Sequence, residues 1–118
     1  MIHAVGTDLV EIERIEKIGI ERFKHKILND DEIKEYNQIT HDSRKLTYLA
    51  GRFAGKESLF KCFKSGDKTA NYKDFSILND AVGAPYVLSK HINGFKVHIT
   101  ISHTNMYAIA FVVLETQL

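Results

Sequence analysis

The stretch FAGKESLFKCF, Phe53 to Phe63, predicts the second half of a long helix, and the fold can be read outward from it. At about 100° per residue, one stripe of this helix is apolar. Glu57 falls close to the middle of the stripe, where an unpaired carboxylate would be costly. Its charge must therefore be neutralised, reach water in a cleft or meet a cation. The apolar side chains of the stripe are those of Leu46, Leu49, Ala50, Phe53 and Phe60.

The simplest partner for Glu57 is Lys61, four residues further along the helix. Such a pair on a half-exposed face contributes only about 0.3 to 0.5 kcal/mol. On the helix alone, this ordinary surface pair is the favoured interpretation. A cation supplied from outside the helix is the alternative.

The two other faces of the helix carry basic and small residues. Ser43 can cap the helix, and from Ser43 to Lys64 six basic residues stand against one acid, a local charge of +5. Lys45, Arg52 and Lys56 lie along one flank, which indicates a solvated charged face unless an anionic ligand is identified. The small residues indicate a close backbone approach, either within the monomer or at a subunit contact. They are Gly51, Gly55, Ser58 and Cys62.

The rest of the chain predicts an α+β fold in a single domain of residues 1–118. A strand is expected from Ile2 to about Thr7, followed by helical segments and, after a polar loop, by antiparallel strands. The helical segments are Leu9 to Gly19, Ile20 to Leu28, a capped short helix after Asn29 and the long helix to about Phe63; short strands flank Val82 to Ala84, and a final hairpin turns at Thr104 and Asn105.

Composition narrows the class of protein. The 118 residues are 44% hydrophobic and 26% charged, which is typical of a soluble globular domain. The net charge of +1 argues against nucleic-acid binding by bulk charge. Cys62 is the single cysteine, which excludes an internal disulfide and favours a reducing compartment. The run Ala108 to Leu114 is too short to span a bilayer and the N-terminus lacks a signal-peptide pattern, so a cytoplasmic protein without a membrane partner is expected.

Asp8 stands at the predicted junction of strand and helix. The segment Asp8 to Glu11 matches a capping box, with Asp8 as N-cap and Glu11 at the third helical position. The alternative role is a metal ligand, because Mg²⁺ is held by one or two carboxylates together with phosphates and water. The two roles are compatible if one carboxylate oxygen points outward.

His103 ends the alternation of Val97, Ile99 and Ile101, so it is expected on the core-facing side at the mouth of the hairpin. A structural role is the commoner one for such a histidine. The six histidines show no HExxH or paired Cys/His spacing, which argues against a zinc site. The chain also lacks Walker A, GxGxxG and GxSxG motifs, so the common nucleotide-binding and hydrolase folds lose support.

Three motifs, in this order, resemble the holo-acyl-carrier-protein synthase type of 4'-phosphopantetheinyl transferase. They are GTDLVEIERI at 6–15, FAGKESLFK at 53–61 and ISHTNMYAIA at 101–110. The segments KILNDDE, YLAGRF and NDAVGAPY extend the similarity from Met1 to about Glu115. The resemblance implies transfer of 4'-phosphopantetheine from coenzyme A to a serine of acyl carrier protein, with release of adenosine 3',5'-bisphosphate. It also implies a homotrimer with active sites between adjacent subunits.

The resemblance implies roles for individual residues. Asp8 and Glu57 match the acids that jointly bind Mg²⁺, and Lys61 matches the catalytic lysine expected near the pyrophosphate. The general base is left open among Glu57, Asp8 and a metal-bound water. Further coenzyme A contacts are expected from Lys45, Arg52, Lys56, Gly83, Pro85, His103 and Thr104, with His103 and Thr104 supplied by a neighbouring subunit. The acidic carrier protein is expected to dock on Arg14, Arg22 and Lys24, with Lys26 either joining them or remaining a solvated charge.

Two departures from the family pattern bear on coenzyme A binding. A glycine-rich loop usually follows the long helix, whereas here Gly66 is the one glycine between Phe63 and Asp67. Ala84 stands where a lysine is common, which predicts weaker coenzyme A binding.

Two rival functions remain open. One is a carrier-binding module without chemistry, against which the presence of both Asp8 and Glu57 argues. The other is a Mg²⁺-dependent nucleotide phosphatase, which would release free phosphate without a carrier protein.

Overall fold

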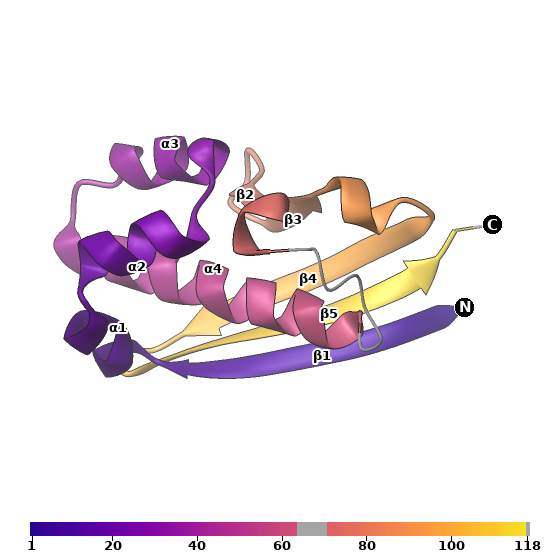
Figure 1. The fold of residues 1–118 in the computed structure, drawn as a ribbon, viewed down its shortest axis with the longest axis horizontal. Helices are drawn as coiled ribbons and strands as arrows, with labels where there is room; N and C mark the ends of the chain where they lie inside the picture. The colour runs from indigo at the N-terminus through magenta and orange to yellow at the C-terminus, as the bar shows by residue number, and fades with distance from the viewer. Residues whose placement is uncertain (64–70, 118) are drawn as a thin grey trace.

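The computed structural model describes residues 1–63 and 71–117. Strands β1, β5 and β4 form an antiparallel sheet in that order, and β2 pairs with β3 in a separate hairpin (Figure 1). This arrangement confirms the predicted α+β class. The elements in chain order are β1 Ile2–Glu11, α1 Ile12–Ile18, α2 Ile20–Ile27, α3 Asp30–Gln38, α4 Asp42–Cys62, the 3₁₀ helix η1 Tyr72–Asp74, β2 Ser76–Asn79, β3 Pro85–Leu88, the 3₁₀ helix η2 Lys90–Ile92, β4 Phe95–His103 and β5 Tyr107–Thr116.

Helix α4 lies along one face of the three-stranded sheet, and small residues allow its close approach (Figure 1). A Cβ atom added at Gly6 of β1 would overlap the carbonyl oxygen of Ser58 in α4. A Cβ atom at Gly51 would lie 2.9 Å from Ile101 of β4. The strip of small residues on α4 therefore packs within the monomer, which decides between the two alternatives that the sequence left open.

Alternation along the strands separates the two faces of the sheet. In β5, Ala108, Ala110, Val112 and Leu114 are buried toward α4. The opposite face exposes large apolar side chains, each between 41% and 62% exposed. These outer-face residues are Val5, Leu9, Tyr107, Ile109 and Phe111.

Strand β1 is longer than predicted, and this changes the role of Asp8. The strand continues through Asp8, which pairs with Ala110, to Glu11, which pairs with Tyr107. Helix α1 begins only at Ile12, and its N-cap is Glu11 without a side-chain hydrogen bond. The capping-box interpretation of Asp8 is therefore wrong, because the main chain of this segment is paired with β5. Asp8 shares its strand face with the buried Gly6 and Val10, so it faces α4.

Other boundaries differ by a residue or two. Helix α4 begins at Asp42 after His41 and has no side-chain cap, so the predicted cap at Ser43 is wrong. The β4–β5 turn also includes Met106, whose N–H is bonded to the hydroxyl of Thr104. The capped helix after Asn29 is confirmed, with a capping box formed by Asn29 and Glu32.

Some sequence predictions lie outside the described residues, namely those on the loop around Gly66. Within the described part of the chain, no helix is long and apolar enough to cross a membrane.

Candidate functional site

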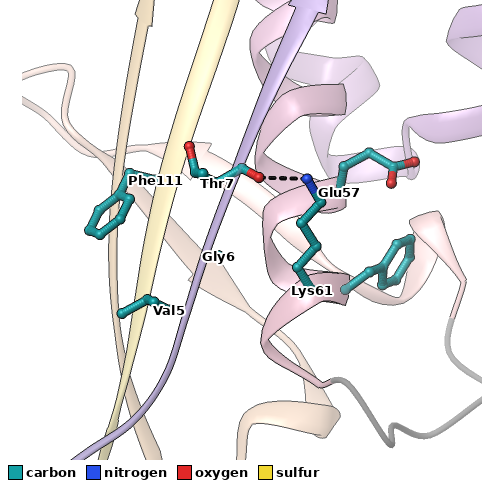
Figure 2. Close-up of a pocket in the computed structure, with 7 residues that line it drawn as sticks. Val5, Gly6, Thr7, Glu57, Lys61 and Phe111 are labelled. Atoms are coloured by element: carbon teal, nitrogen blue, oxygen red, sulfur yellow. Dashed lines mark hydrogen bonds between the residues drawn. The ribbon is translucent and has the colours of Figure 1, made fainter.

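The crossing of β1 and α4 brings Asp8 and Lys61 together. The Lys61 ammonium donates to the carbonyl oxygen of Thr7 at 2.8 Å and to Asp8 Oδ1 at 3.2 Å. Figure 2 shows Lys61 reaching toward β1 while the carboxylate of Glu57 points away from that contact. The surface pair between Lys61 and Glu57 that the sequence favoured is therefore wrong for the described structure, in which Lys61 contacts β1.

Glu57 accepts its hydrogen bond from a tyrosine. The hydroxyl of Tyr72 donates to Glu57 Oε1 at 2.6 Å. Partial burial, then the hydrogen bond to Glu57, raise the pKa of Tyr72 well above its usual value, so its hydroxyl stays protonated as a donor. The ring of Tyr72 packs beside Phe53 and Phe60 of α4, with centroid distances of 5.8 and 5.2 Å.

Two cavities meet at Glu57. The first has a volume of about 370 Å³ and is lined by Asp8, Glu57 and Tyr72 together with the basic residues Arg14 and Lys26. The second has a volume of about 580 Å³, and Glu57 and Lys61 line it among mostly apolar neighbours. Those neighbours include Val5, Phe60 and Phe111. Two carboxylates are thus placed beside three cationic side chains, an arrangement suited to a metal ion and an anionic ligand.

The donor set of the first cavity fits a hard cation. Asp8 and Glu57 supply carboxylate oxygens, and the cavity leaves room for water and phosphate oxygens, which together form the usual environment of Mg²⁺. Among the described residues, no group of three or more His, Cys, Asp or Glu side chains could hold a metal ion by itself. A metal bound here would therefore need ligands from a substrate or from water.

A third cavity, of about 140 Å³, gathers four of the residues expected to contact coenzyme A: Arg52, Gly83, Pro85 and His103. Arg52 is nearly buried and donates to the carbonyl oxygen of Ile77 at 2.9 Å and to Asn79 Oδ1 at 2.8 Å. Arg44 and Asn79, for which the sequence predicted no role, also line this cavity.

Two other expected coenzyme A contacts are placed differently. The Lys45 ammonium lies 5.4 Å from the centre of the Tyr36 ring. The Thr104 hydroxyl accepts the N–H groups of Met106 and Tyr107 within the β4–β5 turn. Neither residue is among those that line the third cavity.

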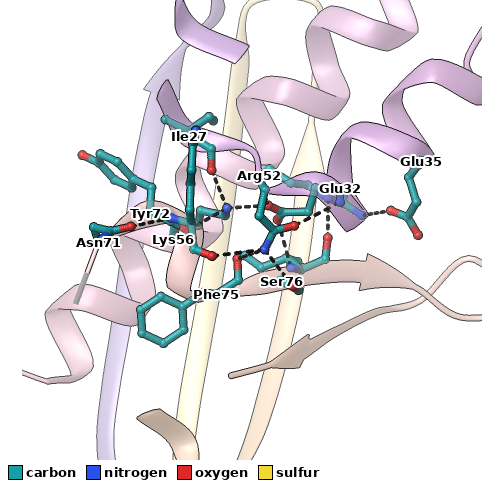
Figure 3. A network of polar contacts seen from close by, with 12 residues as sticks. Ile27, Glu32, Glu35, Arg52, Lys56, Asn71, Tyr72, Phe75 and Ser76 are labelled. Atoms are coloured by element: carbon teal, nitrogen blue, oxygen red, sulfur yellow. Dashed lines mark hydrogen bonds and ion pairs between the residues drawn. The ribbon is translucent and has the colours of Figure 1, made fainter. Parts of the chain in front are cut away.

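The placement of Lys56 corrects its expected contact with coenzyme A. Its side chain is fully buried, and its ammonium donates to Ile27 O, Glu32 Oε1 and Tyr72 O (Figure 3). Three acceptors occupy the three protons of an ammonium group, so none is left for a phosphate. The solvated charged face predicted for Lys45, Arg52 and Lys56 is also wrong, because Arg52 and Lys56 are both buried.

Glu32 is the buried partner of Lys56, and the sequence did not predict this pair. Its side chain is fully buried and accepts the main-chain N–H groups of Asn29 and Ile77 as well as the Lys56 ammonium. Burial raises the pKa of Glu32 and lowers that of Lys56, and the short contact between them opposes both shifts. The only sequence signal for Glu32 was its place in a capping box, which does not reveal a partner 24 residues away.

The basic residues expected to dock a carrier protein divide into two groups. Arg14 and Lys26 line the cavity that holds Asp8 and Glu57. Arg22 is exposed on α2, whereas the Lys24 ammonium lies 2.9 Å from Glu21. Lys26 is therefore better placed near the site than Lys24.

Comparisons with known proteins identify the family of the chain. Residues 4–112 match the family described as the 4'-phosphopantetheinyl transferase superfamily. The holo-[acyl-carrier-protein] synthase of Acholeplasma laidlawii is 79% identical over 99% of both chains, and that of Staphylococcus saprophyticus is 42% identical over 98% of this chain and 99% of the relative. The crystal structure of a Bacillus anthracis holo-(acyl-carrier-protein) synthase in complex with CoA (3',5'-ADP) is similar with a TM-score of 0.89, at 35% identity over 99% of both chains. The chain therefore belongs to the 4'-phosphopantetheinyl transferase superfamily.

Proposed function

We propose that this protein is a holo-acyl-carrier-protein synthase, which transfers the 4'-phosphopantetheine group of coenzyme A to a serine of apo acyl carrier protein. The observation that carries the proposal is a single cavity lined by both Asp8 and Glu57 together with Arg14 and Lys26, with Lys61 bonded to Asp8. The strong similarity to holo-[acyl-carrier-protein] synthases over the full chain supports the same activity.

The reaction exchanges one bond to phosphorus for another. The serine hydroxyl oxygen attacks the β-phosphorus of coenzyme A, and the bond from that phosphorus to the bridging oxygen breaks. Adenosine 3',5'-bisphosphate leaves with the electron pair of the broken bond, and the serine proton passes to a base. Reactions of this type depend mainly on positioning and on neutralising the developing charge.

The described residues can perform both tasks. Asp8 and Glu57 would hold Mg²⁺, which when bound neutralises and polarises the pyrophosphate. Lys61, 53% exposed at the edge of the cavities, can turn its ammonium from Thr7 toward a phosphate oxygen. The proton of the serine can be accepted by either of the two carboxylates.

The nucleotide end of coenzyme A is assigned to the third cavity. Arg52 and Arg44 supply positive charge there for the 3'-phosphate, and Gly83 and Pro85 of the β2–β3 hairpin form a wall for the adenine. His103 enters from the end of β4. The acidic carrier protein would dock on Arg14, Arg22 and Lys26, where its charge is attracted during the encounter.

We also propose a homotrimer. The outer face of the sheet exposes a group of large apolar side chains that a monomer would leave in water. Val5 and Phe111 of this face also line the cavity of Glu57 and Lys61, so a neighbouring subunit covering the face would complete the wall of the site. Analytical ultracentrifugation of the wild type should give the mass of three chains, and Ile109→Asp should shift it toward one.

A carrier-labelling assay tests the activity. Apo acyl carrier protein incubated with coenzyme A, Mg²⁺ and the enzyme should gain the mass of one phosphopantetheine group, as measured by mass spectrometry. Asp8→Ala and Glu57→Ala should abolish the gain. Binding of the carrier without a mass change would favour the non-enzymatic module, and free phosphate released without carrier would favour the phosphatase.

A cytoplasmic location stays an expectation. It is supported by the use of a single cysteine, Cys62, which is buried against β5.

A further inference from the structure

Tyr72 is held by three separate sets of contacts. Its carbonyl oxygen accepts the Lys56 ammonium at 2.8 Å (Figure 3). The single turn of η1 is fixed by reciprocal bonds between Asn71 and its neighbours, with Asp74 accepting the Asn71 N–H at 2.8 Å. The ring is then packed against α4. Both the main chain and the ring of Tyr72 are thus determined by the fold.

The ring contacts place the Tyr72 hydroxyl at Glu57. Phe53 and Phe60 lie four residues before and three residues after Glu57, so the three side chains share one face of α4. Because the Tyr72 ring packs on both phenylalanines, its hydroxyl arrives at the carboxylate that stands between them. The 2.6 Å contact to Oε1 follows from this packing.

We infer that Tyr72 is a positioning residue whose hydroxyl fixes the rotation of the Glu57 carboxylate, so that the other oxygen, Oε2, is presented to a metal ion shared with Asp8. Within the described residues no protein donor is bonded to Oε2. Tyr72, Glu57 and Asp8 line the same cavity, so the oxygen has an open space to face. This inference rests on the proposed metal-dependent transferase function.

The energetic reason is the loss of freedom of a carboxylate. A glutamate with three rotatable bonds must be ordered before it can ligate a metal, and a partner that orders it in advance removes part of that entropic cost. Outer hydrogen-bond partners of metal ligands typically change metal affinity by about 10-fold to 100-fold when they are removed. The aromatic walls of Phe53 and Phe60 prevent the tyrosine itself from swinging away.

The test uses Tyr72→Phe, which keeps the ring and removes only the hydroxyl. Mn²⁺, a paramagnetic ion that also takes oxygen ligands, is titrated against the protein with coenzyme A, and free Mn²⁺ is followed by electron paramagnetic resonance. We expect Tyr72→Phe to bind Mn²⁺ about tenfold more weakly than the wild type. Tyr36→Phe, which removes a hydroxyl from a buried ring between α3 and α4, should bind like the wild type.

A second background shows whether Tyr72 acts through Glu57. In Glu57→Ala, which removes the acceptor of the Tyr72 hydroxyl, the added change Tyr72→Phe should cause no further loss of Mn²⁺ affinity. In transfer assays, Tyr72→Phe should raise the Mg²⁺ concentration needed for half-maximal rate while the rate at saturating Mg²⁺ stays within about twofold of the wild type, as expected for a lost binding interaction.

The outcomes separate the two levels of the proposal. Wild-type affinity in Tyr72→Phe, or an equal loss in the Glu57→Ala background, would overturn the positioning role while leaving the transferase intact. If coenzyme A binds Mn²⁺ equally well with and without the wild-type protein, the proposed metal site is wrong. The inferred role of Tyr72 is then wrong too.

Discussion

Lys56 and Lys61 stand five residues apart on α4 and have opposite surroundings. The Lys56 side chain is fully buried and its ammonium has three protein acceptors, whereas Lys61 is 53% exposed and touches the edge of β1. A lysine whose protons are all bonded within the protein cannot neutralise a ligand. A lysine held at the edge of a cavity by a single carbonyl and a carboxylate can exchange them for a phosphate.

The free-energy cost of removing each lysine also depends on its exposure to water. Lys56 and Glu32 have lost their hydration, so removing either partner leaves a buried charge without compensation. Lys61 keeps much of its contact with water, which screens its interaction with Asp8. Substitutions of the two lysines should therefore affect different properties of the protein.

The largest effect is expected from Lys56→Met. It removes the ammonium that the carbonyl groups of Ile27 and Tyr72 accept and leaves the buried Glu32 carboxylate without its cation, which should lower the free energy of unfolding by about 3 to 5 kcal/mol. Denaturant unfolding measures the loss, and Lys17→Met on the exposed face of α1 is the matched control. Adding Glu32→Gln should recover part of the stability, and a loss no larger than that of the control would contradict the structural role.

The next effect is expected from Lys61→Met. It removes a cation from the edge of the cavity, which should lower kcat/KM for carrier modification by about 100-fold. The free energy of unfolding should change by less than about 1 kcal/mol, because the pair with Asp8 is half-exposed. Steady-state kinetics measures the loss of kcat/KM, and denaturant unfolding measures the change in stability. A loss of stability as large as that of Lys56→Met would contradict the prediction.

Arg52 is buried like Lys56 and lines a cavity like Lys61. It is nearly buried, yet it lines the cavity assigned to the nucleotide. Arg52→Gln should lower the free energy of unfolding by about 1.5 to 3 kcal/mol through its lost hydrogen bonds. Arg52 also lies 3.4 Å from the carboxylate of Glu35, which is partly exposed to water, whereas that of Glu32 is fully buried. The loss should therefore be smaller than for Lys56→Met.

The same variant should also weaken coenzyme A binding, by about tenfold if one charge-assisted contact is lost. Isothermal titration calorimetry measures the dissociation constant. Unchanged affinity in a stably folded Arg52→Gln would assign Arg52 to the fold alone, like Lys56.

The smallest effect is expected from Ala84→Lys. Ala84 is exposed in the turn between β2 and β3, beside Gly83 and Pro85 of the third cavity. A lysine added there should tighten coenzyme A binding a few-fold, which is about the contribution of an exposed ion pair. The dissociation constant in calorimetry checks this change, and an unaltered value would mean that the turn does not approach the nucleotide.

Local patterns in the sequence predicted much of the fold. Alternation in the last two strands predicted the final hairpin, and the polar segment after Asn29 predicted the capped helix α3. The end of β1 was missed because Asp8 looks like a helix cap, while its main chain is held by β5, about a hundred residues further along. Pairing over that separation leaves no local signal.

The site was predicted only in part, and for the same reason. The quoted motifs include Asp8, Glu57 and Lys61, and the structure brings these residues together where β1 crosses α4. Helical spacing put Lys56 on a polar flank, because spacing cannot register that α3 and η1 would cover that flank. Tyr72 reaches its place through tertiary packing and lies in no quoted motif. Asn79 opens the segment NDAVGAPY, but that segment did not predict its bond to Arg52.

The contact between Gly6 and Ser58 limits how this scaffold could be redesigned. The backbones of β1 and α4 touch there, which fixes the distance between the two elements. Asp8 is two residues from Gly6 and Glu57 is one residue from Ser58, so the main chain sets the separation of the two acids. An engineer seeking a wider or narrower gap would gain little from repacking the neighbourhood. Exchanging aspartate for glutamate, or the reverse, is the adjustment that the scaffold leaves available.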